Sequence, residues 1–185
     1  MDKSREDRIQ YLLDRQDIVD AIHRLSRGLD RADRELAISA YHEDGIDDHG
    51  IVVLPAAEFV DWALRMHAEN HISHTHAVAN ITADIDGDVA HVESYHMSFC
   101  ENKVKPDTIA SGRYVDRFER RDGKWAIALR VCISESLYEA TPLNAPAFIT
   151  ALKTNGPAER SRRDVSYERP LTLKRPMQGG ATAIA

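Results

Sequence analysis

The spacing of the apolar residues changes near residue 71, and this change limits the folds open to the chain. Before it, as in residues 9–25, apolar side chains recur at helical spacing with charges between them, which predicts amphipathic helices. After it, apolar and polar residues alternate in long runs that are separated by Asp-Gly turn sequences at residues 86–88 and 121–123, which predicts hairpins. Helices followed by such a meander predict an α+β fold, with the helices packed on one face of a curved antiparallel sheet.

The expected elements follow one another with short connections. Gly28 interrupts the first helix, and Asp33 can cap a short second one. Residues 42–45 have the composition of a turn, and Pro55 suits the start of a helix that runs to about residue 70. The expected strands are residues 46–53, 72–85, 89–101, 109–120 and 124–137.

The 185 residues suit one compact domain, which we place at residues 1–140. From residue 141 the chain is rich in proline and arginine, and we expect an extension over residues 141–185 that is an arm or partly disordered. Residues 147–153 suit a short helix. The arginines between residues 160 and 163 fit either a solvated segment or an arm that packs on a neighbouring subunit.

Charge and composition exclude several classes of protein. A net charge of −6 argues against a nucleic-acid partner, because phosphate contacts need clustered cations. No apolar run approaches the length of a membrane span, and the charged N-terminus is not a signal peptide, so we expect no membrane partner. Two cysteines, Cys100 and Cys132, make no disulfide framework and fit the reducing cytoplasm.

Histidine is unusually frequent: the chain has nine, and six of them fall between residues 42 and 76. Its near-neutral pKa suits both proton transfer and metal binding. In the strand that contains residues 71–80, alternation places His74, His76, Val78 and Asn80 on one face.

A metal site is the main alternative to acid–base chemistry. His74 and His76 offer two ligands on one face, and His71 adds a further imidazole nearby. A zinc or iron site needs a third ligand such as a carboxylate, but no acidic residue follows before Asp84. No glycine-rich phosphate loop or dinucleotide motif is present, and neither cysteine has an adjacent base in the sequence. We therefore expect neither a metal nor a cofactor.

Three stretches, residues 17–33, 41–50 and 112–127, together resemble the SnoaL-like branch of the NTF2-like superfamily. They carry a helix break with Leu29-Asp30, the start of a strand at Tyr41, and a closing hairpin. The resemblance implies a cone-shaped α+β fold in which N-terminal helices and a strongly curved antiparallel sheet enclose one pocket. Because this fold supports several chemistries, the resemblance says less about the reaction.

Within that superfamily the pattern resembles scytalone dehydratase, hexachlorocyclohexane dehydrochlorinase and bile-acid 7α-dehydratase. These cofactor-free lyases use an Asp at the helix break and a His on the first long strand, positions that match Asp30 and His76. A carboxylate beside an imidazole fixes its tautomer and stabilises the imidazolium, which makes the histidine a base. The sequence departs from the pattern at Leu25 and His49, where relatives carry tyrosines.

Other residues are candidates for assisting roles. His96, on the next strand, could act as a general acid, and His49 is expected to face the pocket. Arg130 could pair with Asp30, bind an anionic leaving group, or form an ion pair with Glu135. Tyr41, Asn80, Arg130 and Trp62 are the expected substrate-binding residues.

The sequence thus predicts a cofactor-independent lyase, a dehydratase or related elimination enzyme. It would act on a small hydrophobic substrate, aromatic or polycyclic, and release water or formaldehyde. The alternatives are an isomerase or cyclase with the same dyad, and a non-catalytic ligand-binding or subunit-assembly module. We expect a homodimer or homotrimer, because the convex face of the sheet and the proline-rich arm need cover.

Overall fold

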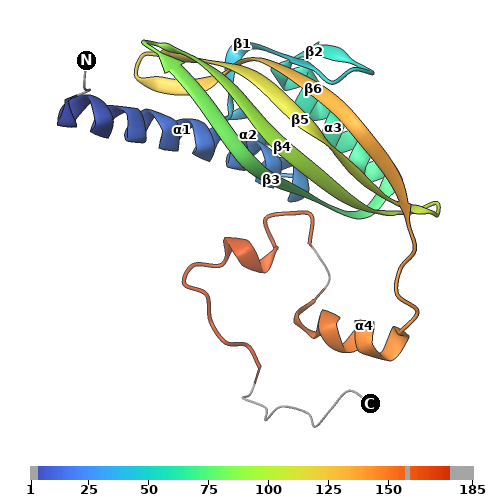
Figure 1. Ribbon diagram of the computed structural model, residues 1–185. Helices are drawn as coiled ribbons and strands as arrows, with labels where there is room; N and C mark the ends of the chain where they lie inside the picture. Colours follow the sequence, from blue (N-terminus) through green and yellow to red (C-terminus); the bar gives the residue numbers. More distant parts are fainter. Residues whose placement is uncertain (1–3, 157–158, 176–185) are drawn as a thin grey trace.

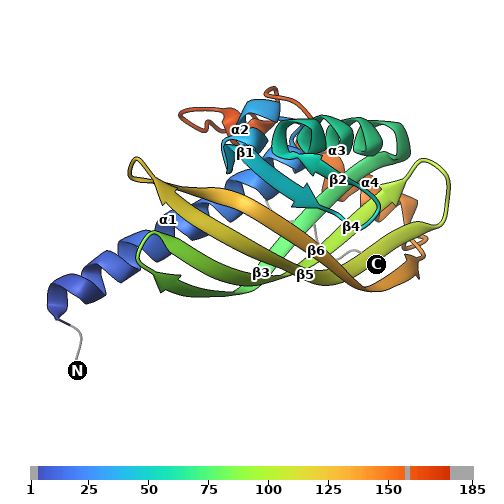
Figure 2. The same ribbon diagram turned by 90° about the horizontal axis from the view of Figure 1, so that it is seen from above.

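The computed structural model describes residues 4–156 and 159–175, in which the helices before residue 71 cover one face of a six-stranded sheet (Figures 1 and 2). The sheet order is β2-β1-β6-β5-β4-β3. The helices are α1 Arg5–Asp30, α2 Arg34–Ile38, α3 Ala56–Asn70 and α4 Pro146–Leu152, with 3-10 turns η1 Lys153–Asn155 and η2 Val165–Tyr167. The strands are β1 Tyr41–Asp48, β2 Val53–Pro55, β3 His71–Asp86, β4 Val89–Asn102, β5 Asp107–Arg121 and β6 Lys124–Ala140.

The predicted α+β fold is confirmed, with one correction to the sheet. Strands β3 to β6 form the expected antiparallel meander, but β1 pairs parallel with β6, so the sheet is mixed. At the turn between β5 and β6, Asp122 and Gly123 both have positive φ, as a two-residue hairpin turn requires. Alternation within β1 predicts a strand, but it carries no information about the direction of its neighbour.

Helix α1 continues through Gly28 to Asp30, so the predicted interruption at Gly28 is wrong. A Cβ on Gly28 would lie 2.5 Å from the backbone nitrogen of Ala37 in α2, so glycine serves close helix packing here. The break itself comes at Ala32, whose φ is 52°. Asp33 then caps α2 by accepting a hydrogen bond from the Leu36 N–H, as predicted.

Strand β1 begins at Tyr41, so the turn predicted at residues 42–45 is wrong. These residues form an irregular part of the strand, where the register with β6 shifts between Tyr41 and Ile46. The buried His42 ring bonds to the Glu119 carbonyl oxygen over 2.8 Å. Turn-type residues therefore mark a bulge, which bends a strand without ending it.

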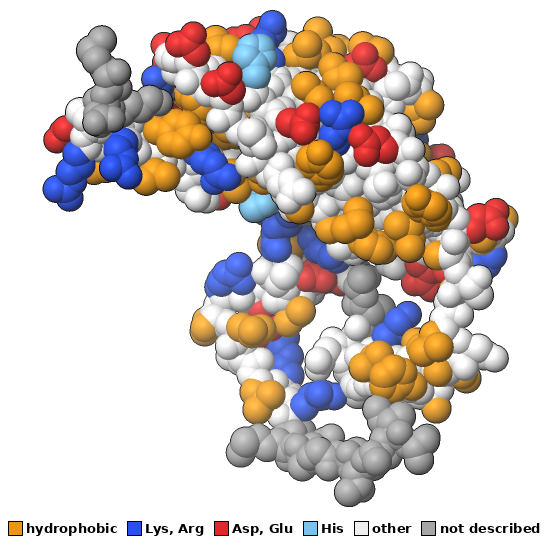
Figure 3. Space-filling view, in the orientation of Figure 1, with side chains coloured by type: hydrophobic (Ala, Val, Ile, Leu, Met, Phe, Trp, Pro, Cys, Tyr) orange, Lys and Arg blue, Asp and Glu red, His pale blue; other side chains and the backbone are white. Residues whose placement is uncertain are grey.

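The hydrophobic core lies between the helices and the concave face of the sheet. Its fully buried side chains include Ile18, Ile22, Leu25, Phe59, Val60, Phe118 and Ile127. On the outer face of β4, by contrast, Tyr95, Met97 and Phe99 are each more than 40% exposed (Figure 3). This apolar face motivated the expectation of a homodimer or homotrimer, which stays a prediction.

The predicted helix at 147–153 is confirmed as α4, and the segment after it returns to the helices of the same chain. Arg160 donates to the carbonyl oxygens of His67 and His71, Arg31 pairs with Asp164, and Tyr167 donates to Asp33. The division at residue 140 and a contact with a neighbouring subunit stay predictions. Residues 157, 158 and 176–185, which include Pro157, Pro176, Gly179 and Gly180, lie outside the described residues. None of the described helices is long and apolar enough to span a membrane.

Candidate active site

A cavity of about 430 Å³ lies between the helices and the concave face of the sheet. Five of the eight predicted site residues line it: His49, Trp62, His76, His96 and Arg130. Aliphatic and aromatic side chains from α1, α3 and β6 provide much of the remaining wall, among them Leu25, Leu29, Phe59, Met66 and Leu137. An apolar wall with a few polar groups is typical of sites for small molecules.

Asp30 and His76 meet as predicted. Nδ1 of His76 lies 2.7 Å from Oδ1 of Asp30, and the backbone N–H of His76 donates to both oxygens of the same carboxylate. The Asp30 side chain is 9% exposed and that of His76 is 10% exposed. The carboxylate therefore holds the Nδ1–H tautomer and leaves Nε2 free to accept a proton.

The position of Asp30 is costly for the fold. It is the last residue of α1, where the helix dipole places a partial negative charge that repels a carboxylate. The backbone N–H and the imidazole of His76 compensate by donating to it. A buried carboxylate at a helix C-terminus destabilises the helix. Residues that destabilise their own element are typical of functional sites.

A second histidine–carboxylate pair stands in the wall formed by β1 and β6. Nδ1 of His49 lies 3.1 Å from Oδ1 of Asp47, and Tyr41 donates to Oδ2 of Asp47 over 2.6 Å. Burial lowers the pKa of His49, but Asp47 and the Cys132 thiol outweigh this effect and raise it to about 9. His49 is thus an imidazolium at neutral pH. Tyr41 is buried behind Asp47 and does not line the cavity, so its predicted role in substrate binding is wrong.

His96, Tyr114 and Arg130 form a stack beside the cavity. The His96 and Tyr114 rings lie 4.2 Å apart, and the Arg130 guanidinium lies 4.0 Å above the Tyr114 ring. Burial, with nearby His76 and Arg130, lowers the pKa of His96 to about 4, so this ring is neutral at pH 7. A neutral imidazole at pH 7 is poorly suited to the predicted role of general acid.

Arg130 is held by a carboxylate that the sequence did not suggest. Its Nε and Nη2 both donate to Asp116 over 2.7 Å, and both side chains are almost completely buried. The expected pairings with Asp30 and Glu135 are therefore wrong, and Glu135 pairs with Arg113 instead. Cross-strand neighbours explain this, because Asp116 lies directly opposite Arg130 in the β5–β6 ladder.

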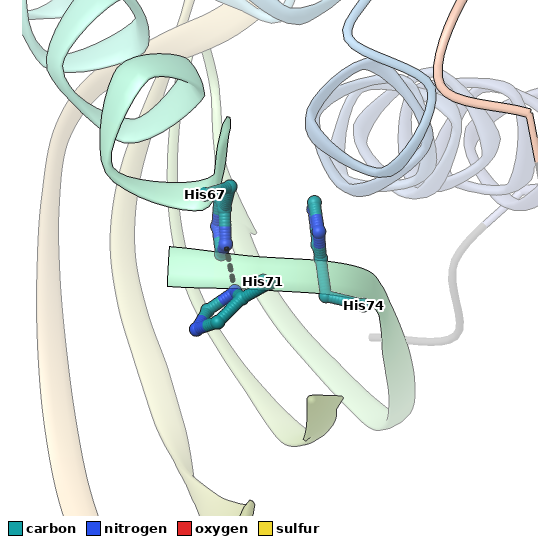
Figure 4. Close-up of side chains that lie close together, drawn as sticks. All are labelled: His67, His71 and His74. Atoms are coloured by element: carbon teal, nitrogen blue, oxygen red, sulfur yellow. Dashed lines mark hydrogen bonds between the residues drawn. The ribbon is translucent and has the colours of Figure 1, made fainter. Parts of the chain in front are cut away.

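Three more histidines gather at the junction of α3 and β3 (Figure 4). Nδ1 of His67 lies 2.9 Å from Nδ1 of His71, and the His67 ring stacks on His74 at 3.8 Å. Nε2 of His74 donates to the Leu29 carbonyl oxygen. Burial and neighbouring positive groups lower the pKa of His67 to about 2 and that of His74 to about 4. These rings are neutral at pH 7.

The model of the SnoaL-like domain family matches residues 10–131. The chain belongs to the SnoaL-like family. No curated protein matches this SnoaL-like chain. The predicted NTF2-like fold is confirmed by the solved structures that resemble it.

Several of these structures carry the names of enzymes. A Novosphingobium aromaticivorans protein proposed to be a scytalone dehydratase is 20% identical, with a TM-score of 0.64 over 73% of this chain and 93% of that one. The hexachlorocyclohexane dehydrochlorinase LinA-type3 from Novosphingobium barchaimii is 16% identical, with a TM-score of 0.68 over 74% and 97%. A third, of unknown function from Mycobacterium tuberculosis, is 23% identical, with a TM-score of 0.58 over 68% and 74%. At these identities the likeness describes the fold.

Some residues at the cavity of the SnoaL-like chain were not predicted from the sequence. Asp47 could have been found, because it lies two residues before His49 and therefore on the same face of the strand. Tyr114 and His67 gave no signal of their own, and both line the cavity only because β5 and α3 fold over it. Asn80 was wrongly placed: it is exposed, with φ at 48°, at a register shift that interrupts the alternation.

Proposed function

We propose that this SnoaL-like chain is a cofactor-independent lyase that eliminates water or a related small group from a hydrophobic substrate. One observation carries the proposal: the 2.7 Å contact between Nδ1 of His76 and Asp30 in the wall of an apolar cavity. A non-catalytic binding module would have no use for a carboxylate buried at a helix C-terminus, where it opposes the dipole.

In the first step, Nε2 of His76 removes a proton from a carbon atom of the substrate. Asp30 stabilises the imidazolium that results, because its carboxylate accepts the Nδ1–H and carries the opposite charge. The electron pair of the broken C–H bond forms the new double bond as the leaving group departs from the neighbouring carbon. No metal or organic cofactor is needed for this step.

The departing group needs a proton if it leaves as water. We assign this role to His49, which lines the same cavity and whose pKa of about 9 keeps it charged at neutral pH. After release, proton exchange with solvent returns His76 to its neutral form and His49 to its charged form. A base and an acid with well-separated proton affinities are the arrangement that such an elimination needs.

The cavity supports a small substrate with an apolar body. Its volume of about 430 Å³ lies near the lower end of the usual range for ligand pockets. Phe59 and Trp62 offer aromatic surface at one wall, and the Tyr114 ring contributes at another. These surfaces favour an aromatic or polycyclic compound that carries one or more hydroxyl groups.

The experiment is a mass-spectrometric screen of hydroxylated aromatic, steroid and polyketide compounds with the full chain. Elimination removes the mass of the leaving group, whereas isomerisation leaves the mass unchanged but exchanges hydrogen when run in deuterium oxide. His76→Asn and Asp30→Asn should each lower kcat by about 10²–10⁴-fold on any compound that is turned over.

The matched control is His91→Asn, which changes an exposed histidine on β4. It should keep full activity, and circular dichroism should show that all three variants remain folded. Near-normal turnover by a folded His76→Asn variant would refute the proposed base. A product of unchanged mass would favour the isomerase, which uses the same dyad.

A further inference from the structure

A cluster of three histidines lies outside the acid–base machinery, and we define it as His67, His71 and His74. His67 comes from the last turn of α3, while His71 and His74 come from the first residues of β3 (Figure 4). One ring nitrogen from each lies within 4.8 Å of the other two. His67 and His71 also line the cavity, so a group bound between them would face the substrate space.

The first two members lie within chelating distance of each other, where one ring N–H now donates to the other ring nitrogen. Their spacing of four residues brings both Nδ1 atoms to the same side, 2.9 Å apart. Nitrogens at that separation, each about 2.1 Å from a shared ion, would subtend roughly 90° at it. Copper, nickel and zinc ions all accept imidazole nitrogens, and such angles occur in tetragonal or octahedral coordination.

The third member has a free lone pair. Nδ1 of His74 is buried and has no hydrogen-bond partner among the described residues, an arrangement that costs free energy. An imidazole binds a metal ion through such a lone pair.

We propose that His67 and His71 hold a divalent transition-metal ion and that His74 completes the site. Two changes are required. The hydrogen bond between Nδ1 of His67 and Nδ1 of His71 must break, with its proton moving to Nε2 of the same ring. The rings of His67 and His74 are parallel within 7° and 3.8 Å apart, and a metal lies close to the plane of each imidazole that binds it. The His74 ring must therefore turn out of the stack. The remaining coordination positions then face the cavity, where a hydroxyl or carbonyl oxygen of a bound molecule would be the natural ligand.

A second arrangement uses His74 differently. Asp30, His74 and His76 also place one donor atom each within 4.8 Å. There, however, Asp30 already accepts hydrogen bonds from the backbone N–H and Nδ1 of His76. A metal would have to displace both, whereas the three-histidine cluster loses only the hydrogen bond between His67 and His71, so we favour that cluster. The two sites share His74 but differ in every other ligand, and this difference permits a clear test.

The test uses isothermal titration calorimetry on the full chain, prepared without an affinity tag and stripped with EDTA. Zn²⁺ and Ni²⁺ are the probes, and Mg²⁺ is the control ion because it prefers oxygen ligands. We expect one Zn²⁺ or Ni²⁺ per chain and no response to Mg²⁺. His67→Ala and His74→Ala should each weaken binding at least about tenfold. His91→Ala and His76→Asn should leave it unchanged.

A second measurement guards against variants that misfold. Visible absorption of bound Co²⁺ reports its ligands directly, and His71→Ala, at a half-buried position, is the variant least disruptive to the core. Loss of the Co²⁺ spectrum in folded His71→Ala supports the site. The proposal is overturned if the stripped protein binds neither Zn²⁺ nor Ni²⁺. It is also overturned if His76→Asn abolishes binding while His67→Ala does not, because the ion then lies at Asp30.

Discussion

Gly28 packs so tightly on Ala37 that a Cβ at residue 28 would lie 2.5 Å from the Ala37 backbone nitrogen and 2.7 Å from its Cα. This contact sets how closely α2 approaches the end of α1. Asp30 follows within two residues, so the contact also contributes to the placement of the Asp30 carboxylate. Gly28 has no side chain that could take part in chemistry, yet its packing thus affects the geometry of the Asp30–His76 pair.

Gly28→Ala should therefore destabilise the fold although alanine favours helices. Overpacking against backbone atoms costs about 1–3 kcal/mol, more than the roughly 1 kcal/mol gained in helix propensity. Urea unfolding measures the difference. His23→Ala, at an exposed position of the same helix, is the control and should be neutral or slightly stabilising. Equal stability of Gly28→Ala and the native chain would contradict the close contact.

Breaking the buried ion pair between Arg130 and Asp116 should strongly lower the free energy of unfolding. Burial lowers the pKa of the Arg130 guanidinium, but Asp116 outweighs it and holds the pKa above its ordinary value, so the guanidinium stays charged. Burial also raises the pKa of the Asp116 carboxyl, and Arg130 opposes that rise. Asp116→Asn leaves a buried cation without its counter-charge, and we expect a loss of about 3–5 kcal/mol in urea unfolding.

The matched comparison is Glu135→Gln, which removes a charge from the more exposed pair with Arg113. It should cost no more than about 1 kcal/mol. If the two variants lose similar stability, the Asp116–Arg130 pair is not desolvated as described.

His49 should titrate far above the other histidines. Its pKa of about 9 implies that the ring is charged below that pH, and Asp47 is its principal charged partner. Because this pKa is raised, the stabilisation is fully present below about pH 6.5 and is lost as the pH rises through about 9. NMR titration of the His49 ring should show this midpoint, and Asp47→Asn should lower it by at least one pH unit. A native midpoint near 6.5 would remove His49 as the proposed acid.

Acid should destabilise the protein through its buried neutral histidines. His67, with a pKa of about 2, and His74 and His96, each with a pKa of about 4, stay neutral in the folded chain. In the unfolded chain they bind protons near pH 6.5. The unfolded state therefore binds more protons below pH 6.5, and stability falls as the pH drops from about 6.5 toward 4.

Each of these rings contributes up to about 1.4 kcal/mol per pH unit to that slope. Urea unfolding between pH 7.5 and pH 4.5 measures it, and His96→Gln should make the slope shallower. His91→Gln, which alters an exposed ring, should leave it unchanged. An identical slope in both variants would mean that His96 is protonated in the folded chain.

Much of the fold and the central dyad could be predicted before any coordinates, because both depend on local patterns. Alternation in β3 correctly placed His74 and His76 on one face of the strand, where both lie beside Asp30, and the turn residues at 122 and 123 marked a hairpin. The resemblance pointed to Asp30 as the partner of His76, 46 positions earlier in the chain, and the two side chains do meet. The prediction that Asn80 shares this face was wrong because a register shift in β3 reverses the alternation. A bulge of this kind has no clear sequence signal.

The sequence by itself determined the order of the elements, most of their types and, away from register shifts, which side chains of a strand share a face. Local periodicity and turn chemistry carry that information. The tertiary structure alone decided which charges become partners: Asp47 with His49 and Tyr41, Asp116 with Arg130, and His67 with His71 and His74. The physical reason is that protonation states depend on burial and on the distance to the nearest charge. Packing creates both, and it gave the histidines different partners: a carboxylate for His76 and for His49, and each other's rings for His67 and His74.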